Sequence, residues 1–226
     1  MKIRYYIFLL AAISLTVSCA IDNYDEPQSF LTGKVVHNGE IIPVENDQVK
    51  FRLYEPGYQL SSGFIEVTIN QDGSYSSLLF NGQYKLIFEE GEGPFKSIDT
   101  ISIDLKGSTE MDIEVTPYYM INNSQISNSG STINATCSVS QIINGVDARD
   151  IERVTLFINK TQFVSGNGDE NIAQSSADDI SDLSNLSMLV DIPSITPTQN
   201  YVFARIGVKI VDVQDMLFTP VEKISF

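Results

Sequence analysis

Residues 201–210 read YVFARIGVKI, a stretch in which an apolar residue stands at every second position. Successive side chains of a β-strand point to opposite faces of the sheet. One face therefore carries the alternating apolar residues from Val202 to Ile210, and the other carries Arg205 and Lys209. The stretch predicts a long strand that is packed on one side only.

The same alternation recurs on both sides of this stretch in the second half of the chain. Further strands are predicted at Ser131–Ser140, Arg153–Asn159, Leu186–Ile192 and Met216–Ile224. The Asn- and Ser-rich segment 120–130 is assigned no strand, and a domain boundary is placed near residue 118. Short alternating strands with regular turns are typical of an immunoglobulin-like or fibronectin III-like β-sandwich, which we assign to residues 119–226.

Residues 30–118 predict a second unit of the same class. Strands are expected at 31–36, 49–54, 64–69, 74–76, 83–88, 98–105 and 111–115. The turn signals Asp72-Gly73 and Asn81-Gly82 separate several of them, and no helical period is present. The fold class is therefore all-β, with two antiparallel β-sandwich domains.

The first eighteen residues predict a signal peptide. Lys2 and Arg4 precede an apolar run, residues 5–17, that is shorter than the roughly 20 residues of a spanning helix. Ser18-Cys19 then follows, which indicates a lipoprotein signal and a lipid on Cys19. An ordinary secretory signal with an incidental cysteine is the alternative. Residues 19–29, which are polar, acidic and broken by Pro27, predict a flexible spacer that carries the anchored protein.

The charge of the chain argues against several partners. It has 14 Lys and Arg against 29 Asp and Glu, and removal of Lys2 and Arg4 leaves 12 against 29, a net charge of −17. So acidic a body repels phosphate backbones and anionic headgroups. We therefore expect no nucleic-acid partner and no membrane contact through a basic surface.

Residues suited to catalysis are scarce. With Cys19 lipidated, Cys137 is the remaining cysteine, and it shares an alternating face with Ile133 and Val139, which predicts a buried, inert thiol. The single histidine, His37, ends a strand and is expected at a surface turn. No hydrolase or zinc motif occurs. We expect no enzymatic activity, no cofactor and no metal site.

The segment Ser165–Ser184 is the most acidic connection. At about twenty residues it exceeds a usual loop, so it is either functional or mobile. Its acids match no defined calcium loop, yet calcium binding stays open beside a solvated loop. A helical turn within 178–186 is a further option. The acids considered as ligands are Asp169, Asp178, Asp179 and Asp182.

Four segments carry a family resemblance: Asp22-Asn23-Tyr24-Asp25-Glu26-Pro27, residues 31–36, 72–75 and 81–84. They resemble an uncharacterised, domain-of-unknown-function family of Bacteroidetes outer-membrane lipoproteins. The resemblance implies an N-terminal domain like the regulatory, transthyretin-like (prealbumin-like) domain of carboxypeptidases and an Ig-like C-terminal domain. It also implies a place at the cell surface beside a starch-utilisation-type outer-membrane transporter and its glycan-binding lipoprotein partner.

The expected function is therefore non-enzymatic and accessory to glycan binding or uptake in a polysaccharide-utilisation system. A structural or scaffold lipoprotein for protein assembly or adhesion is the alternative. Because the chain has no Trp, sugar contacts would rest on Tyr and Phe side chains. The candidates are Tyr54, Tyr58, Phe95, Tyr118 and Tyr119, although Tyr118 and Tyr119 could instead pack the two domains together.

Overall fold

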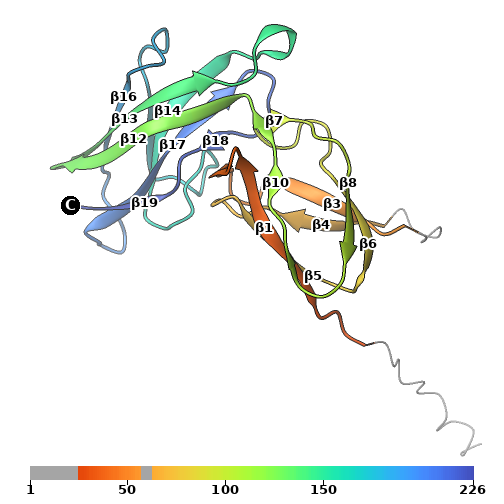
Figure 1. Cartoon of the computed structure of the whole chain (residues 1–226). Coiled ribbons are helices and arrows are strands. Elements are labelled where there is room, and N and C mark those ends of the chain that lie inside the picture. Colours follow the sequence, from red (N-terminus) through yellow and green to blue (C-terminus); the bar gives the residue numbers. More distant parts are fainter. Residues whose placement is uncertain (1–24, 57–62) are drawn as a thin grey trace, which may run out of the picture.

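The computed structural model describes residues 25–56 and 63–226. In these ranges the chain forms strands, turns and a 3-10 turn at Gly145–Asp147, with no α-helix, and the predicted all-β class of two β-sandwiches is confirmed (Figure 1). In the same ranges, no helix is long and apolar enough to cross a membrane. The predicted signal peptide 1–18, Cys19 and Tyr58 lie outside the described residues.

The N-terminal unit is built from two facing sheets. The central strand of the first sheet is β1, and the second sheet has the order β4-β3-β6-β8. The first sheet contains β1 (Ser29–His37), β2 (Glu40–Ile41), β5 (Ser74–Leu79), β9 (Thr109–Glu110) and β10 (Ile113–Glu114). The second contains β4 (Ile65–Thr68), β3 (Lys50–Tyr54), β6 (Gly82–Ile87) and β8 (Ile101–Leu105).

Two short pairings depart from the antiparallel pattern. Both β9 and β10 pair with β1 in parallel. After β8 the chain crosses to the other sheet and runs beside β1 in the same direction, which a hairpin connection would not allow. Between the sheets, Phe51 packs edge-on against Tyr75 with ring centroids 5.0 Å apart. The alternation in β3 therefore buries Phe51 and Leu53 and leaves Lys50 and Arg52 on the outer face.

The C-terminal unit also has two sheets. One has the order β12-β13-β16, and the other has the order β15-β14-β17-β18 with β19 beside β17. Their strands are β12 (Tyr119–Ser129), β13 (Thr132–Gln141), β16 (Leu186–Asp191), β15 (Ala173–Ser176), β14 (Ile151–Asn159), β17 (Tyr201–Ile210), β18 (Leu217–Phe218) and β19 (Glu222–Ser225). A small ribbon of β7 (Phe95–Lys96) and β11 (Thr116–Pro117) precedes Tyr118 at the junction of the units.

The segment 120–130, which was assigned no strand, is the long strand β12. It pairs with β13 along its length, with an irregularity between Asn122 and Gln125 where Asn123 has φ 51°. Because β12 is an edge strand with much of its surface in water, Asn and Ser side chains are tolerated on it. Composition therefore suggested a loop where backbone pairing makes a strand.

Two other predicted segments are corrected. The expected strand Met216–Ile224 is divided into β18 and β19, because Pro220 between them has no N–H to donate to a ladder. The segment Ser165–Ser184 contains β15, which pairs with β14. No helix forms within 178–186, where the chain makes bends and a turn at residues 183–184.

The strand predicted at residues 201–210 is confirmed as β17. The prediction that only one of its faces is packed is wrong. Val202, Ala204 and Ile206 are fully buried as expected, and so is Arg205 on the opposite face. Cys137 is buried on its predicted face. Arg205 is covered by Val164 and Phe218 of its own unit and by Val44 of the N-terminal unit, and the alternation of the sequence cannot predict such packing between distant segments.

Candidate binding cleft at the domain junction

The structure separates the aromatic residues that were considered for sugar contact. Tyr54 lies on β3, and its ring packs against that of Phe64 with centroids 5.8 Å apart. Phe95 and Tyr118 both line a cleft at the junction of the two units. Tyr119 is buried in the core. Only Phe95 and Tyr118 of the described candidates are thus brought to one place.

This cleft, which we call the hinge cleft, has a volume of about 310 Å³. Parts of both units form it: the β6–β7 loop, β7 itself, the linker, and two turns of the C-terminal unit. Its lining residues are Glu90, Gly91, Gly93, Phe95, Lys96, Ser97, Tyr118, Arg149, Asp212 and Val213. The volume is at the lower end of the range usual for small-molecule sites.

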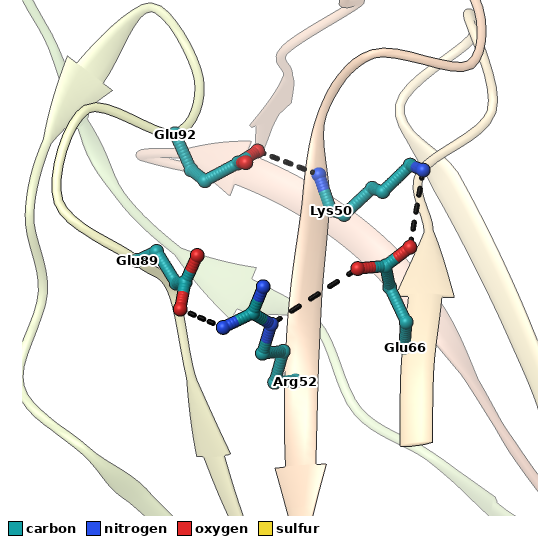
Figure 2. Close-up of polar contacts among 5 residues, drawn as sticks. All are labelled: Lys50, Arg52, Glu66, Glu89 and Glu92. Carbon is teal, nitrogen blue, oxygen red and sulfur yellow. Dashed lines mark hydrogen bonds and ion pairs between the residues drawn. The ribbon is translucent and has the colours of Figure 1, made fainter. Parts of the chain in front are cut away.

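The β6–β7 loop, one wall of the cleft, is fixed by charged residues on the outer face of the second sheet (Figure 2). Arg52 forms an ion pair with Glu89, and the Lys50 N–H donates to Oε2 of Glu92 at 3.0 Å. Glu66 lies between the two cations, with its Oε1 3.1 Å from Nζ of Lys50. The loop is therefore held at both ends to β3.

Glycine is required where the loop turns into the cleft. Gly93 has φ +78°, and a Cβ there would lie 2.3 Å from the ring of Phe95. Its N–H donates to Oδ2 of Asp215 at 2.8 Å, which ties the loop to the C-terminal unit. Gly91 has a similar φ of +89°, but no atom lies within 4 Å of its virtual Cβ.

Both units also position the linker tyrosines. The Tyr118 N–H donates to the carbonyl of Pro94, and its own carbonyl accepts from the Ile142 N–H at 2.9 Å. The half-buried Tyr118 therefore presents one side to the cleft. The Tyr119 hydroxyl donates to the carbonyl of Arg149 at 2.6 Å, so Tyr119 supports the cleft from the core.

Two ion pairs lie at the cleft. Nη1 of Arg149 lies 3.4 Å from Oδ2 of Asp212, and Nζ of Lys96 lies 2.6 Å from Oδ2 of Asp147. The hydrogen bond with Asp147 raises the pKa of Lys96, and Lys96 lowers the pKa of Asp147. Guanidinium and ammonium donors beside carboxylate acceptors suit a ligand rich in hydroxyls, which both donate and accept.

The junction also contains a buried contact between the two units, which we call the Arg205 seam. It consists of Val44 and Glu45 from the N-terminal unit with Val164, Arg205 and Phe218 from the C-terminal unit. Arg205 Nε donates to the Val164 carbonyl, and its Nη1 donates to the Val44 carbonyl at 3.1 Å. The guanidinium lies 3.7 Å from the ring centroid of Phe218. The Arg205 side chain thus makes hydrogen bonds to both units.

Burial dominates the titration of the charged groups at the junction. It lowers the pKa of Arg205 to about 9, which leaves the group cationic at neutral pH. It raises the pKa of Glu45, against the lowering effect of the hydrogen bond with Ser165. It likewise raises the pKa of Asp215, against the hydrogen bond from Gly93.

The cysteine, the histidine and the acidic segment that were considered for catalysis or metal binding lie outside the cleft. Burial raises the pKa of the Cys137 thiol to about 11, so the nucleophilic thiolate is scarce at neutral pH. His37 Nδ1 lies 2.8 Å from the carbonyl of Val115. Asp179 and Asp182 accept hydrogen bonds from Ser181 and Ser184, which lower the pKa of both carboxyls. In the described ranges no three His, Cys, Asp or Glu side chains are grouped to hold a metal ion.

Sequence reasoning missed the charged residues of the junction. Lys96 lies on β7, Arg149 and Asp212 lie in separate connections of the C-terminal unit, and only the packing of the two units brings the three together. One feature of the sequence could have indicated that the Arg205 face of β17 is packed. Gly207, two positions after Arg205 on the same face, has no side chain. A Cβ at Gly207 would lie 2.6 Å from the Phe218 ring, so the bare position marks a packed face.

Comparisons with known proteins agree on one family. A model described as "Protein of unknown function (DUF3823) N-terminal domain" matches residues 29–116, and one described as "Domain of unknown function (DUF3823_C)" matches residues 119–223. No curated protein sequence matches the chain.

Solved structures show the same relationship. A DUF3823 family protein from Parabacteroides merdae is 33% identical, with a TM-score of 0.77, over 89% of this chain and 100% of that chain. One from Bacteroides ovatus is 30% identical, also with a TM-score of 0.77, over 88% and 99%. A protein from Bacteroides uniformis described as a candidate carbohydrate-binding protein has a TM-score of 0.70 at 16% identity, over 88% and 100%, and shares the fold.

Proposed function

Because this chain belongs to the DUF3823 family, we propose that it is a non-enzymatic, surface-exposed outer-membrane lipoprotein that binds glycans for uptake, with the hinge cleft as its site. The predicted resemblance to a two-domain family of unknown function is confirmed by these relatives. The lipid anchor on Cys19, the place at the cell surface and the transporter partners are parts of the proposal that rest on the sequence.

The observation that carries the proposal is the composition of the hinge cleft. A half-buried aromatic side chain, Tyr118, stands beside Arg149, Asp212 and Lys96 in a space of about 310 Å³. Sugars offer an apolar ring face and hydroxyls at its edge, and the cleft offers an aromatic surface with charged donors and acceptors. A site of this size fits one or two sugar units. The description of the Bacteroides uniformis relative as a candidate carbohydrate-binding protein adds support.

Calorimetric titration of the purified protein against a panel of oligosaccharides tests this function. We expect one glycan class to bind, and we expect Tyr118→Ala to weaken binding at least about tenfold, or about 1.4 kcal/mol. Tyr54→Ala is the matched control, because it removes an aromatic ring outside the cleft. Binding that is lost in Tyr54→Ala and kept in Tyr118→Ala would place the site on β3 and refute the cleft.

A scaffold function is the second candidate, and the Arg205 seam favours it. A fully buried cation that joins both units makes a two-domain body of fixed angle, as protein assembly requires. Absence of binding to every glycan, together with co-purification of the chain with an outer-membrane transporter, would support the scaffold over the glycan binder.

A further inference from the structure

One end of the N-terminal unit carries three exposed apolar side chains. Phe30 is 47% exposed, Leu78 46% and Phe80 48%. Phe30 faces Leu78 across the β1–β5 ladder, and Phe80 is the residue that directly follows β5. Figure 1 shows that this end, where the chain enters β1, lies away from the C-terminal unit. We call these three residues the apolar tip.

The apolar tip stands on a fixed backbone. Oδ1 of Asn81 accepts hydrogen bonds from the Ser29 hydroxyl and from the Gly107 N–H, each at 2.7 Å. The Tyr84 hydroxyl donates to the carbonyl of Phe80 at 2.9 Å. Three segments of the chain are thus joined where the apolar side chains project. A cluster of exposed apolar side chains on an ordered surface is typical of a contact site.

The short segment between Cys19 and β1 would keep the apolar tip close to the lipid bilayer. Ten residue steps separate Cys19 from Ser29, so a lipid on Cys19 keeps the start of β1 within about 36 Å of the bilayer. The turn beside Asn81 and Gly107 carries Lys106, whose Nζ is paired with Asp104 at 2.5 Å, so the apolar side chains and not a basic patch would carry the contact. Phe and Leu side chains gathered on one exposed face are typical of a surface that enters a membrane interface.

We propose that the apolar tip docks on the surface of the lipid bilayer that holds the anchor. The inference rests on the lipid anchor of the proposed function and adds an orientation to it. Phe30, Leu78 and Phe80 enter the headgroup region, and the N-terminal unit stands on the membrane. Strand β7, which lines the hinge cleft, lies at the other end of this unit, so the docking would hold the cleft away from the lipid (Figure 1).

Because the chain contains no Trp, a single Trp reports on its own position. The full lipidated chain with Phe80→Trp is reconstituted in vesicles of phosphatidylethanolamine and phosphatidylglycerol with brominated acyl chains. We expect bromine to quench this Trp about twofold relative to unbrominated vesicles. Phe163→Trp in the C-terminal unit is the matched control, since Phe163 is 45% exposed, and its Trp should keep its fluorescence.

The outcomes separate the docking from the anchor. Protein that is retained by the vesicles with an unquenched Trp at position 80 overturns the docking and leaves the anchor intact. Protein that is not retained overturns both. Adding Phe30→Ser and Leu78→Ser to Phe80→Trp should return quenching to the level of the Phe163→Trp control, while circular dichroism shows an unchanged fold. Quenching that persists in this variant also contradicts the proposal.

Discussion

Two parts of the domain junction, the Arg205 seam and the hinge cleft, use an arginine in opposite ways. In the seam, Arg205 is fully buried, contacts two backbone carbonyls and stacks on Phe218. In the hinge cleft, the side chain of Arg149 is 45% exposed and has one long contact, to Asp212. A buried cation with fixed partners holds structure in place, whereas an exposed cation with a loose partner can exchange it for a ligand. The seam therefore fixes the angle between the units, and the cleft is left free to bind.

Removing the seam cation should have the largest effect on stability. Arg205→Ala leaves two buried carbonyls without their donor and takes a positive charge away from Glu45, and we expect a loss of about 3–5 kcal/mol in the free energy of unfolding. Urea denaturation followed by circular dichroism measures it. Arg153→Ala, which removes an exposed cation from the neighbouring strand, should change stability by less than about 0.5 kcal/mol. Equal effects of the two substitutions would show that the seam does not join the units.

The glycines of the cleft wall give the next largest effect. Gly93→Ala combines a positive φ with a contact on the Phe95 ring, and we expect a loss of about 2–3 kcal/mol. Gly91→Ala meets no neighbouring atom, so only the backbone strain of about 1 kcal/mol remains. Thermal unfolding of both variants tests the difference. If Gly91→Ala were the more damaging of the two, the packing of Gly93 on Phe95 would not shape the loop.

The charge of Glu45 should show a smaller effect that depends on pH. Burial raises the pKa of Glu45 above 4.5, so its contribution to stability is present below about pH 4.5 and is lost as the pH rises through the raised value. Glu45→Gln removes the cost of burying the charge. The variant should therefore be more stable than the wild type at pH 7 and should lose this advantage towards pH 4. An advantage that grows as the pH falls would contradict the raised pKa.

Substitution in the cleft should affect stability least. Arg149→Ala removes an exposed side chain with one long contact, and we expect a change of no more than about 0.5 kcal/mol in urea denaturation. A loss comparable to that of Arg205→Ala would mean that the cleft, like the seam, holds the units together.

The sequence predicted single strands and their buried faces well, and it did not predict the contacts between the two units. The alternation of residues 201–210 predicted β17 and its buried face, and the position of Cys137 was predicted in the same way. The burial of Arg205 and the assembly of Lys96, Arg149 and Asp212 depend on packing between elements far apart in the chain. The strand β12 was missed because its polar side chains face water, and pairing with β13 alone defines it.

The most direct test of the account is a map of amide chemical-shift changes while the bound oligosaccharide is titrated into labelled protein. The account predicts changes confined to residues 90–97, Tyr118, Arg149 and residues 212–213, with the amides of the Arg205 seam unmoved. Changes centred on Tyr54 and Phe64, or spread along the seam, would contradict the claim that a fixed junction presents a binding cleft on its open side.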